Sequence, residues 1–246
     1  MKLVRRCYQQ DIPRVWLYFA CFCQPTIDCI ACSLYVWFGG EAPSTKPLSF
    51  FINLLLSIPV GSLGEEFGWR GILVPNCLDI FDEKYGSTQD YVAEGENVDV
   101  TAFHITTKED LHGGRLSVHQ HEGRKRWRWS CLATCLVTGV FWACWHLPAF
   151  YVKVLTQNHC NFFQFLIQEV LYTIFYVLQA NHTNQSILAA ILMHASINSF
   201  GGLVPWGTES FPPFITMPNA LLTLVLFFAG LGVISITGVE LGRKST

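Results

Sequence analysis

The run from Leu54 to Val74 is almost entirely apolar, yet it contains Glu65, Glu66 and Arg70. A run of this length and polarity is typical of a membrane-spanning helix. Each charged side chain at the centre of a bilayer costs roughly 2.5–3.5 kcal/mol on insertion scales. Three charges so close together therefore need a compensating environment. We expect them to face the interior of a helix bundle rather than lipid.

The composition of the whole chain supports the membrane class. Of its 246 residues, 51% are hydrophobic and 14% are charged, whereas soluble domains carry about 25% charged residues. The apolar runs predict an all-α fold, a polytopic membrane helix bundle of about six transmembrane helices. The predicted spans are 15–38, 48–77, 131–152, 162–180, 186–204 and 220–239. The net charge of −2 argues against a nucleic-acid partner.

Two interruptions mark the predicted bundle. Pro59 and Gly61 predict a kink or break that divides the second span into pieces at 48–59 and 62–77. Residues 78–129 are polar and charged, so we expect a loop insertion within a single domain that covers residues 1–246. The insertion contains four histidines whose spacing matches no common set of metal ligands, and a solvated loop is the simpler interpretation. They are His104, His112, His119 and His121.

Basic residues predict the orientation of the bundle. With six spans, both termini and the 78–129 insertion fall on one side, together with most of the Lys and Arg residues. That side carries Lys2, Arg5, Arg6, Arg14, the cluster at 124–128, Arg243 and Lys244, and the other side carries Lys46 and Lys153. We therefore expect the termini and the insertion to be cytoplasmic.

Several polar or reactive residues in the spans favour a packing role over chemistry. Seven of the ten cysteines lie in apolar runs, where cysteine packs as a small hydrophobic residue. Cys29 and Cys32 form a CxxC pair without a second pair or a nearby histidine, so neither a disulfide nor a metal site is predicted there. Asp28 is expected to be a polar residue that faces the interior.

Helix geometry separates the roles of the two adjacent glutamates. Glu66 and Arg70 are four residues apart and share one helix face, where they can pair. Glu65 points about 100° away and is left to face another group. A carboxylate in a pocket of low dielectric can act as a general base towards a bound water.

Two further spans carry histidines at membrane depth. His146 precedes Leu147 and Pro148, where the helix can loosen. His194 and Asn198 are four apart and project from one face, which suits an oxyanion clamp, a metal site or plain hydrogen bonding between helices. Together with Glu65 these groups favour a hydrolytic site in a membrane cavity.

These three motifs resemble those of the CPBP family of intramembrane proteases, which includes CAAX prenyl endopeptidases of the Rce1 type and bacterial Abi proteins. The family pattern is EExxxR, then FxxxH, then HxxxN. Residues 65–70 match the first motif and residues 194–198 match the third, while Trp142 stands where the second has Phe. The resemblance implies a helical membrane bundle with a cavity open to the cytoplasm and the bilayer.

The resemblance also implies roles for the site residues. Glu65 would activate a water that His146 helps to hold. His194 and Asn198 would stabilise the tetrahedral oxyanion, and Glu66 with Arg70 would order the site. The family was named as metalloproteases, and Zn²⁺ bound by Glu65, His146 and His194 is an open option; hydrolysis by a water without metal is the other.

The predicted function is an intramembrane endopeptidase that hydrolyses a peptide bond at or near the membrane. Its expected partners are the lipid bilayer and a peptide or prenylated protein, of the CAAX type or another membrane-associated kind. The multi-pass protein is expected in the plasma membrane of a prokaryote or the endoplasmic reticulum of a eukaryote. One alternative is a non-catalytic member of the same fold that acts in bacteriocin immunity or as a scaffold. Another is a transporter with a proton relay, which would need internal repeats that the sequence lacks.

Overall fold

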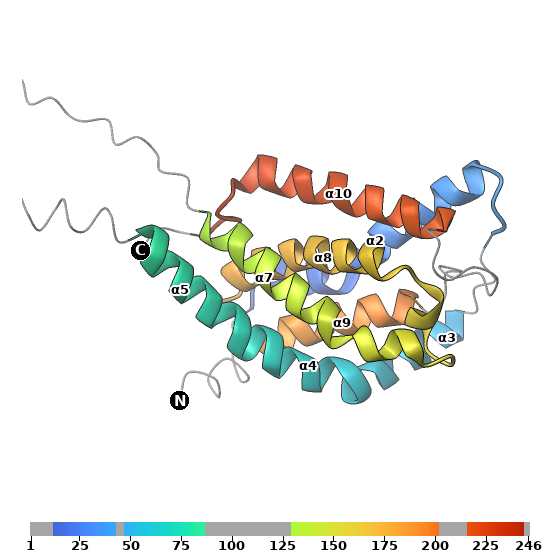
Figure 1. Cartoon of the computed structure of the whole chain (residues 1–246), viewed down its shortest axis with the longest axis horizontal. Coiled ribbons are helices and arrows are strands. Elements are labelled where there is room, and N and C mark those ends of the chain that lie inside the picture. Colours follow the sequence, from blue (N-terminus) through green and yellow to red (C-terminus); the bar gives the residue numbers. More distant parts are fainter. Residues whose placement is uncertain (1–11, 43–46, 87–128, 202–215, 244–246) are drawn as a thin grey trace, which may run out of the picture.

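The computed structural model describes residues 12–42, 47–86, 129–201 and 216–243. All regular elements in these ranges are helical, which confirms the predicted all-α class. The α-helices are α2 (Arg14–Trp37), α3 (Pro47–Ser57), α4 (Leu63–Gly68), α5 (Val74–Gly86), α7 (Ser130–Trp145), α8 (Phe162–His182), α9 (Ile187–Gly201) and α10 (Met217–Thr237). Figure 1 shows them as one bundle of roughly aligned helices.

Four stretches are long and apolar enough to cross a bilayer, namely Arg14–Trp37, Ser130–Tyr151, Phe162–His182 and Met217–Thr237. The predicted spans agree with these bounds to within a few residues. The shorter helix α9 and the run from α3 to α5 correspond to the other two predicted spans. The bundle therefore follows the pattern of apolar runs in the sequence.

Helix α8 forms the centre of the bundle. Its second half is buried almost without interruption, from Leu171 to Ala180, and it packs against α7, α9, α10 and α2. Asn161 begins this helix, because its side-chain oxygen accepts a hydrogen bond from the backbone N–H of Gln164 at 3.1 Å. Figure 1 shows α7, α9 and α10 around it. Helix α8 therefore positions the helices that surround it.

The second predicted span does not break at Pro59. Helix α3 passes into a π-helical turn at Ile58–Ser62 and then into α4, and a second π-helical turn at Trp69–Leu73 leads into α5. Proline has no backbone N–H to donate, and a wider turn allows the helix to continue past it. The run is helical throughout, so the predicted break does not occur, but the α-helix is interrupted by a π-helical turn at the position where a kink or break was predicted.

The predicted insertion also begins later than expected. Residues 78–86 continue helix α5, which packs against α7. Asp82 on this helix forms an ion pair with Arg243 at 2.7 Å. These contacts give helical structure to a segment whose charged residues predicted a loop. Residues 87–128, with the four histidines and the basic cluster, lie outside the described residues.

All nine cysteines in the described ranges are free thiols. Asp28 is 2% exposed and accepts a hydrogen bond from the amide of Gln24 at 2.9 Å, so it faces the interior as predicted.

Candidate active site

The two glutamates of the first motif lie on α4, between the two π-helical turns. Such turns are rare and are frequently found at functional sites. Glu66 is completely buried, whereas the side chain of Glu65 is 23% exposed. The adjacent carboxylates therefore occupy different environments, as the helix geometry predicted.

Glu66 is the centre of a buried ion cluster. Its Oε1 accepts a hydrogen bond from Nη1 of Arg70 at 2.7 Å and another from Nδ1 of His194 at 2.7 Å. The guanidinium carbon of Arg70 lies 4.1 Å from the centre of the Trp142 ring and 3.5 Å from that of Tyr176, in cation–π contact with both. The predicted pairing of Glu66 with Arg70 is confirmed, and His194 joins the pair from α9.

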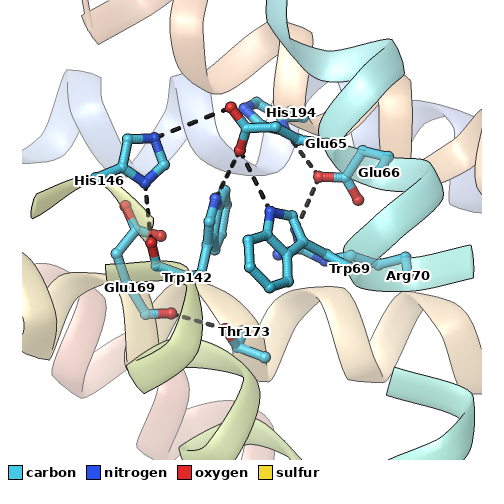
Figure 2. A network of polar contacts seen from close by, with 9 residues as sticks. All are labelled: Glu65, Glu66, Trp69, Arg70, Trp142, His146, Glu169, Thr173 and His194. Atoms are coloured by element: carbon cyan, nitrogen blue, oxygen red, sulfur yellow. Dashed lines mark hydrogen bonds and ion pairs between the residues drawn. The ribbon is translucent and has the colours of Figure 1, made fainter. Parts of the chain in front are cut away.

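Glu65 is held by aromatic donors instead of a guanidinium (Figure 2). Its Oε2 accepts hydrogen bonds from the indole N–H of Trp142 at 2.8 Å and from that of Trp69 at 3.4 Å. Its Oε1 lies 4.0 Å from Nε2 of His146. These contacts fix one carboxylate oxygen and leave the other directed towards the imidazole.

His146 lies where helix α7 changes into a tighter turn. The α-helix ends at Trp145, and a 3₁₀ turn with Pro148 follows at Leu147–Tyr151, so the helix changes at the predicted place but becomes tighter instead of looser. Nδ1 of His146 is 3.0 Å from the carbonyl oxygen of Trp142. A carbonyl oxygen can only accept, so Nδ1 carries a proton, and in the neutral ring Nε2 presents its lone pair towards Glu65.

His194 and Asn198 meet at a cavity rather than at Glu65. This cavity has a volume of about 250 Å³, and His146, His194 and Asn198 all line it. We call it the polar cavity because of these side chains. His194 is buried while Asn198 is exposed. The Nδ1 of His194 contacts Glu66, the other glutamate of the first motif.

A second, larger cavity lies on the other side of Glu65. Its volume is about 640 Å³, and it is mostly apolar. Its lining consists of Gly61, Gly64, Glu65, Gly68, Trp69, Leu73, Phe141 and Trp145. Since Glu65 lines the apolar cavity and His146 lines the polar one, the 4.0 Å gap between them lies where the two cavities approach each other.

Four residues of this network were missed by the sequence reasoning. Trp142 was assigned only a packing role, although a buried indole N–H requires an acceptor. Trp69 and Tyr176 gave no signal of their own. Glu169 stood out as a charge inside an apolar span, and Figure 2 shows its side chain extending from α8 towards His146.

The predicted zinc ligands do not form a metal site in this arrangement. Among the described residues, no group of three or more His, Cys, Asp or Glu side chains is placed to hold a metal ion. Two ligands of a tetrahedral zinc ion are about 3.4 Å apart, which is shorter than the 4.0 Å between Glu65 and His146. The donor set therefore does not fit Zn²⁺.

A comparison with protein families places the chain. A family model of Rce1-like type II CAAX prenyl endopeptidases matches residues 47–200. The chain belongs to this Rce1-like family. A search of curated proteins finds no match. The matched region contains all six predicted site residues and all four that the sequence reasoning missed. Membership implies a hydrolase of the protease class, and together with the four long apolar helices it makes the chain an integral membrane protein.

Proposed function

We propose that the protein is an intramembrane endopeptidase in which Glu65 and His146 activate a water molecule for attack on a peptide bond. The observation that carries this proposal is the facing pair itself. Oε1 of Glu65 and Nε2 of His146, both acceptors, lie 4.0 Å apart between a polar and an apolar cavity.

The gap between the two acceptors suits a water that donates both of its hydrogens. Two hydrogen bonds of about 2.8 Å to atoms 4.0 Å apart subtend about 90° at the water oxygen, close to the angle between the hydrogens of water. The oxygen lone pairs then point away from both acceptors. Glu65 takes one proton as the lone pair attacks the carbonyl carbon, and it later gives that proton to the leaving amine nitrogen.

The oxyanion would form beside the polar cavity. His194 contacts Glu66 through Nδ1, so its Nε2 is the atom that can donate to the developing negative charge when the ring carries both protons. The amide of Asn198 lines the same cavity and supplies a second donor. Glu66 and Arg70 act as positioning residues, because they fix the ring of His194 and the indole of Trp142.

The two cavities support a substrate with one apolar and one polar side. The 640 Å³ cavity is wide enough for a hydrocarbon chain or large apolar side chains, and the 250 Å³ cavity offers hydrogen-bonding groups. A prenylated peptide of the CAAX type has this division, as do other membrane-associated peptides. We propose this substrate class for the protein.

The test is cleavage of a farnesylated CAAX peptide by the purified full-length protein in detergent. We expect Glu65→Ala and His146→Ala each to lower kcat by about 100-fold or more, because a general base contributes typically 10²–10⁴-fold. Both variants should still insert in membranes and elute as folded protein. Asp79→Asn, an exposed carboxylate on α5, serves as the control and should cleave normally.

A chelator tests the role of a metal in the same assay. Because the donor set does not fit zinc, we expect the rate to be unchanged after treatment with the chelator. Full activity in Glu65→Ala would overturn the proposed mechanism. Loss of cleavage on chelation, restored by Zn²⁺, would show instead that the site rearranges to bind metal.

A further inference from the structure

The polar cavity contains two carboxylates that the proposed mechanism does not use. Asp28 from α2 and Glu169 from α8 line it together with His146 and His194. They are only 2% and 5% exposed. Neither belongs to the residues that align with the family motifs, so their place in the cavity requires its own explanation.

Glu169 is aimed into the cavity without a partner. Its Oε2 is buried and has no hydrogen-bond partner, and Figure 2 shows the side chain extending towards His146. None of the ion pairs in the described part of the chain includes it. Its neighbour Gln168 does not help, because that amide donates to Asn219 and Thr223 instead.

Asp28 is positioned on another wall of the cavity. The amide of Gln24 donates to Oδ1 of Asp28 at 2.9 Å and also to the hydroxyl of Tyr172 at 3.1 Å. Tyr172 lines the cavity as well, and its hydroxyl still has a proton to donate. Gln24 thus holds Asp28 in place but supplies no charge.

No Lys or Arg of the described residues forms an ion pair with these carboxylates. The lining of the cavity contains no Lys or Arg. Arg70 lies outside the lining and acts on Glu169 only through its electric field, because its own hydrogen bond goes to Glu66 and it stacks against two rings. Buried charges are normally paired, and an unpaired carboxylate at this depth is costly. Both acidic groups therefore lack the complementary charge that a ligand can bring.

We infer that the polar cavity is a subsite for a basic side chain of the substrate, a primary amine or guanidinium near the scissile bond, which Glu169 and Asp28 receive. The inference rests on the proposed function, since the cavity also contains His146, His194 and Asn198. It makes Glu169 a specificity-determining residue. The apolar groups of the substrate occupy the other cavity.

The experiment compares matched farnesylated CAAX peptides that carry either lysine or norleucine at each position flanking the scissile bond. At one position the full-length protein should cleave the lysine peptide about tenfold or more faster, as kcat/KM, because a hydrogen bond between charged groups is lost with norleucine. In Glu169→Gln this ratio should fall towards one. Asp28→Asn should lower the ratio in part, and Asp79→Asn should leave it unchanged.

A binding measurement separates the subsite from the catalytic proposal. The same peptides are titrated into Glu65→Ala, and lysine should again bind more tightly than norleucine. Cleavage without a preference for lysine at any position overturns the subsite and leaves the protease proposal standing. Binding that prefers lysine, with no cleavage by the wild type, overturns the protease proposal for these peptides and supports the subsite. If Glu169→Gln fails to fold, the ratio in Asp28→Asn decides.

Discussion

Two neighbouring glutamates differ here because of their contacts, not their chemistry. Glu66 is enclosed by Arg70 and His194, both 2.7 Å from one oxygen, so its charge is balanced inside the bundle. Glu65 receives two indole N–H groups, which hold a carboxylate in place without neutralising it. A carboxylate that is fixed yet not neutralised retains its capacity to accept a proton, which is what a general base requires.

The indole of Trp142 offers the sharpest test of how Glu65 is held. Trp142→Phe retains an aromatic ring for Arg70 but removes the N–H that lies 2.8 Å from Oε2 of Glu65. A hydrogen bond to a charged group contributes about 1.5–3 kcal/mol, so kcat should fall by about tenfold or more. KM should change less than kcat, since phenylalanine keeps most of the ring surface that lines the polar cavity.

The control is Trp129→Phe, an exposed tryptophan at the start of α7, which should cleave at the normal rate. The thermal stability of Trp142→Phe should remain close to that of the wild type. An unchanged kcat would mean that the shorter contact to Glu65 has no part in catalysis.

The buried cluster leads to a stability prediction. Arg70→Met removes the guanidinium and leaves the fully buried Glu66 carboxylate, which should cost about 3–5 kcal/mol of unfolding free energy. The double variant Glu66→Gln with Arg70→Met removes both charges and should recover part of that loss. Thermal denaturation in detergent measures both. Equal destabilisation in the single and double variants would mean that the ion pair is not what Arg70 contributes.

Residue contacts were predictable where a helix alone dictates them. Glu66 and Arg70 meet because they are four apart on one helix. The contact of Glu66 with His194 joins residues 128 positions apart, and only the packing of α9 against α4 brings them together. The same is true of Trp142 and Glu65, so the sequence predicted the members of the site but not their partners.

At the scale of elements, the apolar runs predicted most helix bounds because span length is set by bilayer thickness. The predictions of secondary structure were wrong where charged residues or a proline lie within a helix. Charged residues at 78–86 suggested a loop, yet Asp82 is paired with Arg243, and α5 continues along α7. Pro59 suggested a break, yet a π-helical turn accommodates it. Neither the ion pair nor the π-helical turn can be predicted from the local sequence.

The approach of α7 to α8 gives a prediction at this scale. A Cβ at Gly139 would lie 2.5 Å from the Cα of Val170, so the two backbones meet without room for a methyl group. Gly139→Ala must separate the helices, and we expect a loss of about 1–3 kcal/mol. The lower thermal midpoint should be accompanied by lower activity, because α7 carries Trp142 and His146.

Gly232→Ala on α10 is the matched control, since nothing lies within 4 Å of its added Cβ. In a helix that change should be neutral or stabilising by up to about 1 kcal/mol. If Gly139→Ala were as stable as Gly232→Ala, the close approach of the two backbones would not matter to the fold.

The interior of the bundle contains many polar side chains, and its surface exposes many apolar side chains. Gln164, Gln168, Glu169 and Gln179 are buried on the central helix α8, whereas α10 exposes Phe227, Phe228 and Ile236. Water would not favour such a surface, but a bilayer does. The polar interior is where hydrolysis in a membrane has to take place, since it is the region that can hold water and charge.

Contacts between helix ends define one end of the bundle. Trp16 at the start of α2 stacks on His182 at the end of α8, with ring centres 4.4 Å apart. Asn181 donates to the carbonyl of Leu241 at 3.2 Å, and Asp82 near the end of α5 pairs with Arg243. These are the ends that the distribution of basic residues assigned to one side.

This arrangement predicts the membrane topology. A tag inserted in residues 87–128 and a tag after Thr246 should both be digested when protease is added to the cytoplasmic face of sealed vesicles, because α5 and α10 end together and basic residues favour that face. A tag at Val154, which is 90% exposed in the turn between α7 and α8, should resist digestion until detergent opens the vesicles.

Each tagged protein must still cleave the peptide, which shows that the tag has not disturbed the fold. Digestion of the first two tags from opposite faces would rule out the six-span arrangement, since an odd number of crossings would then separate the ends of α5 and α10.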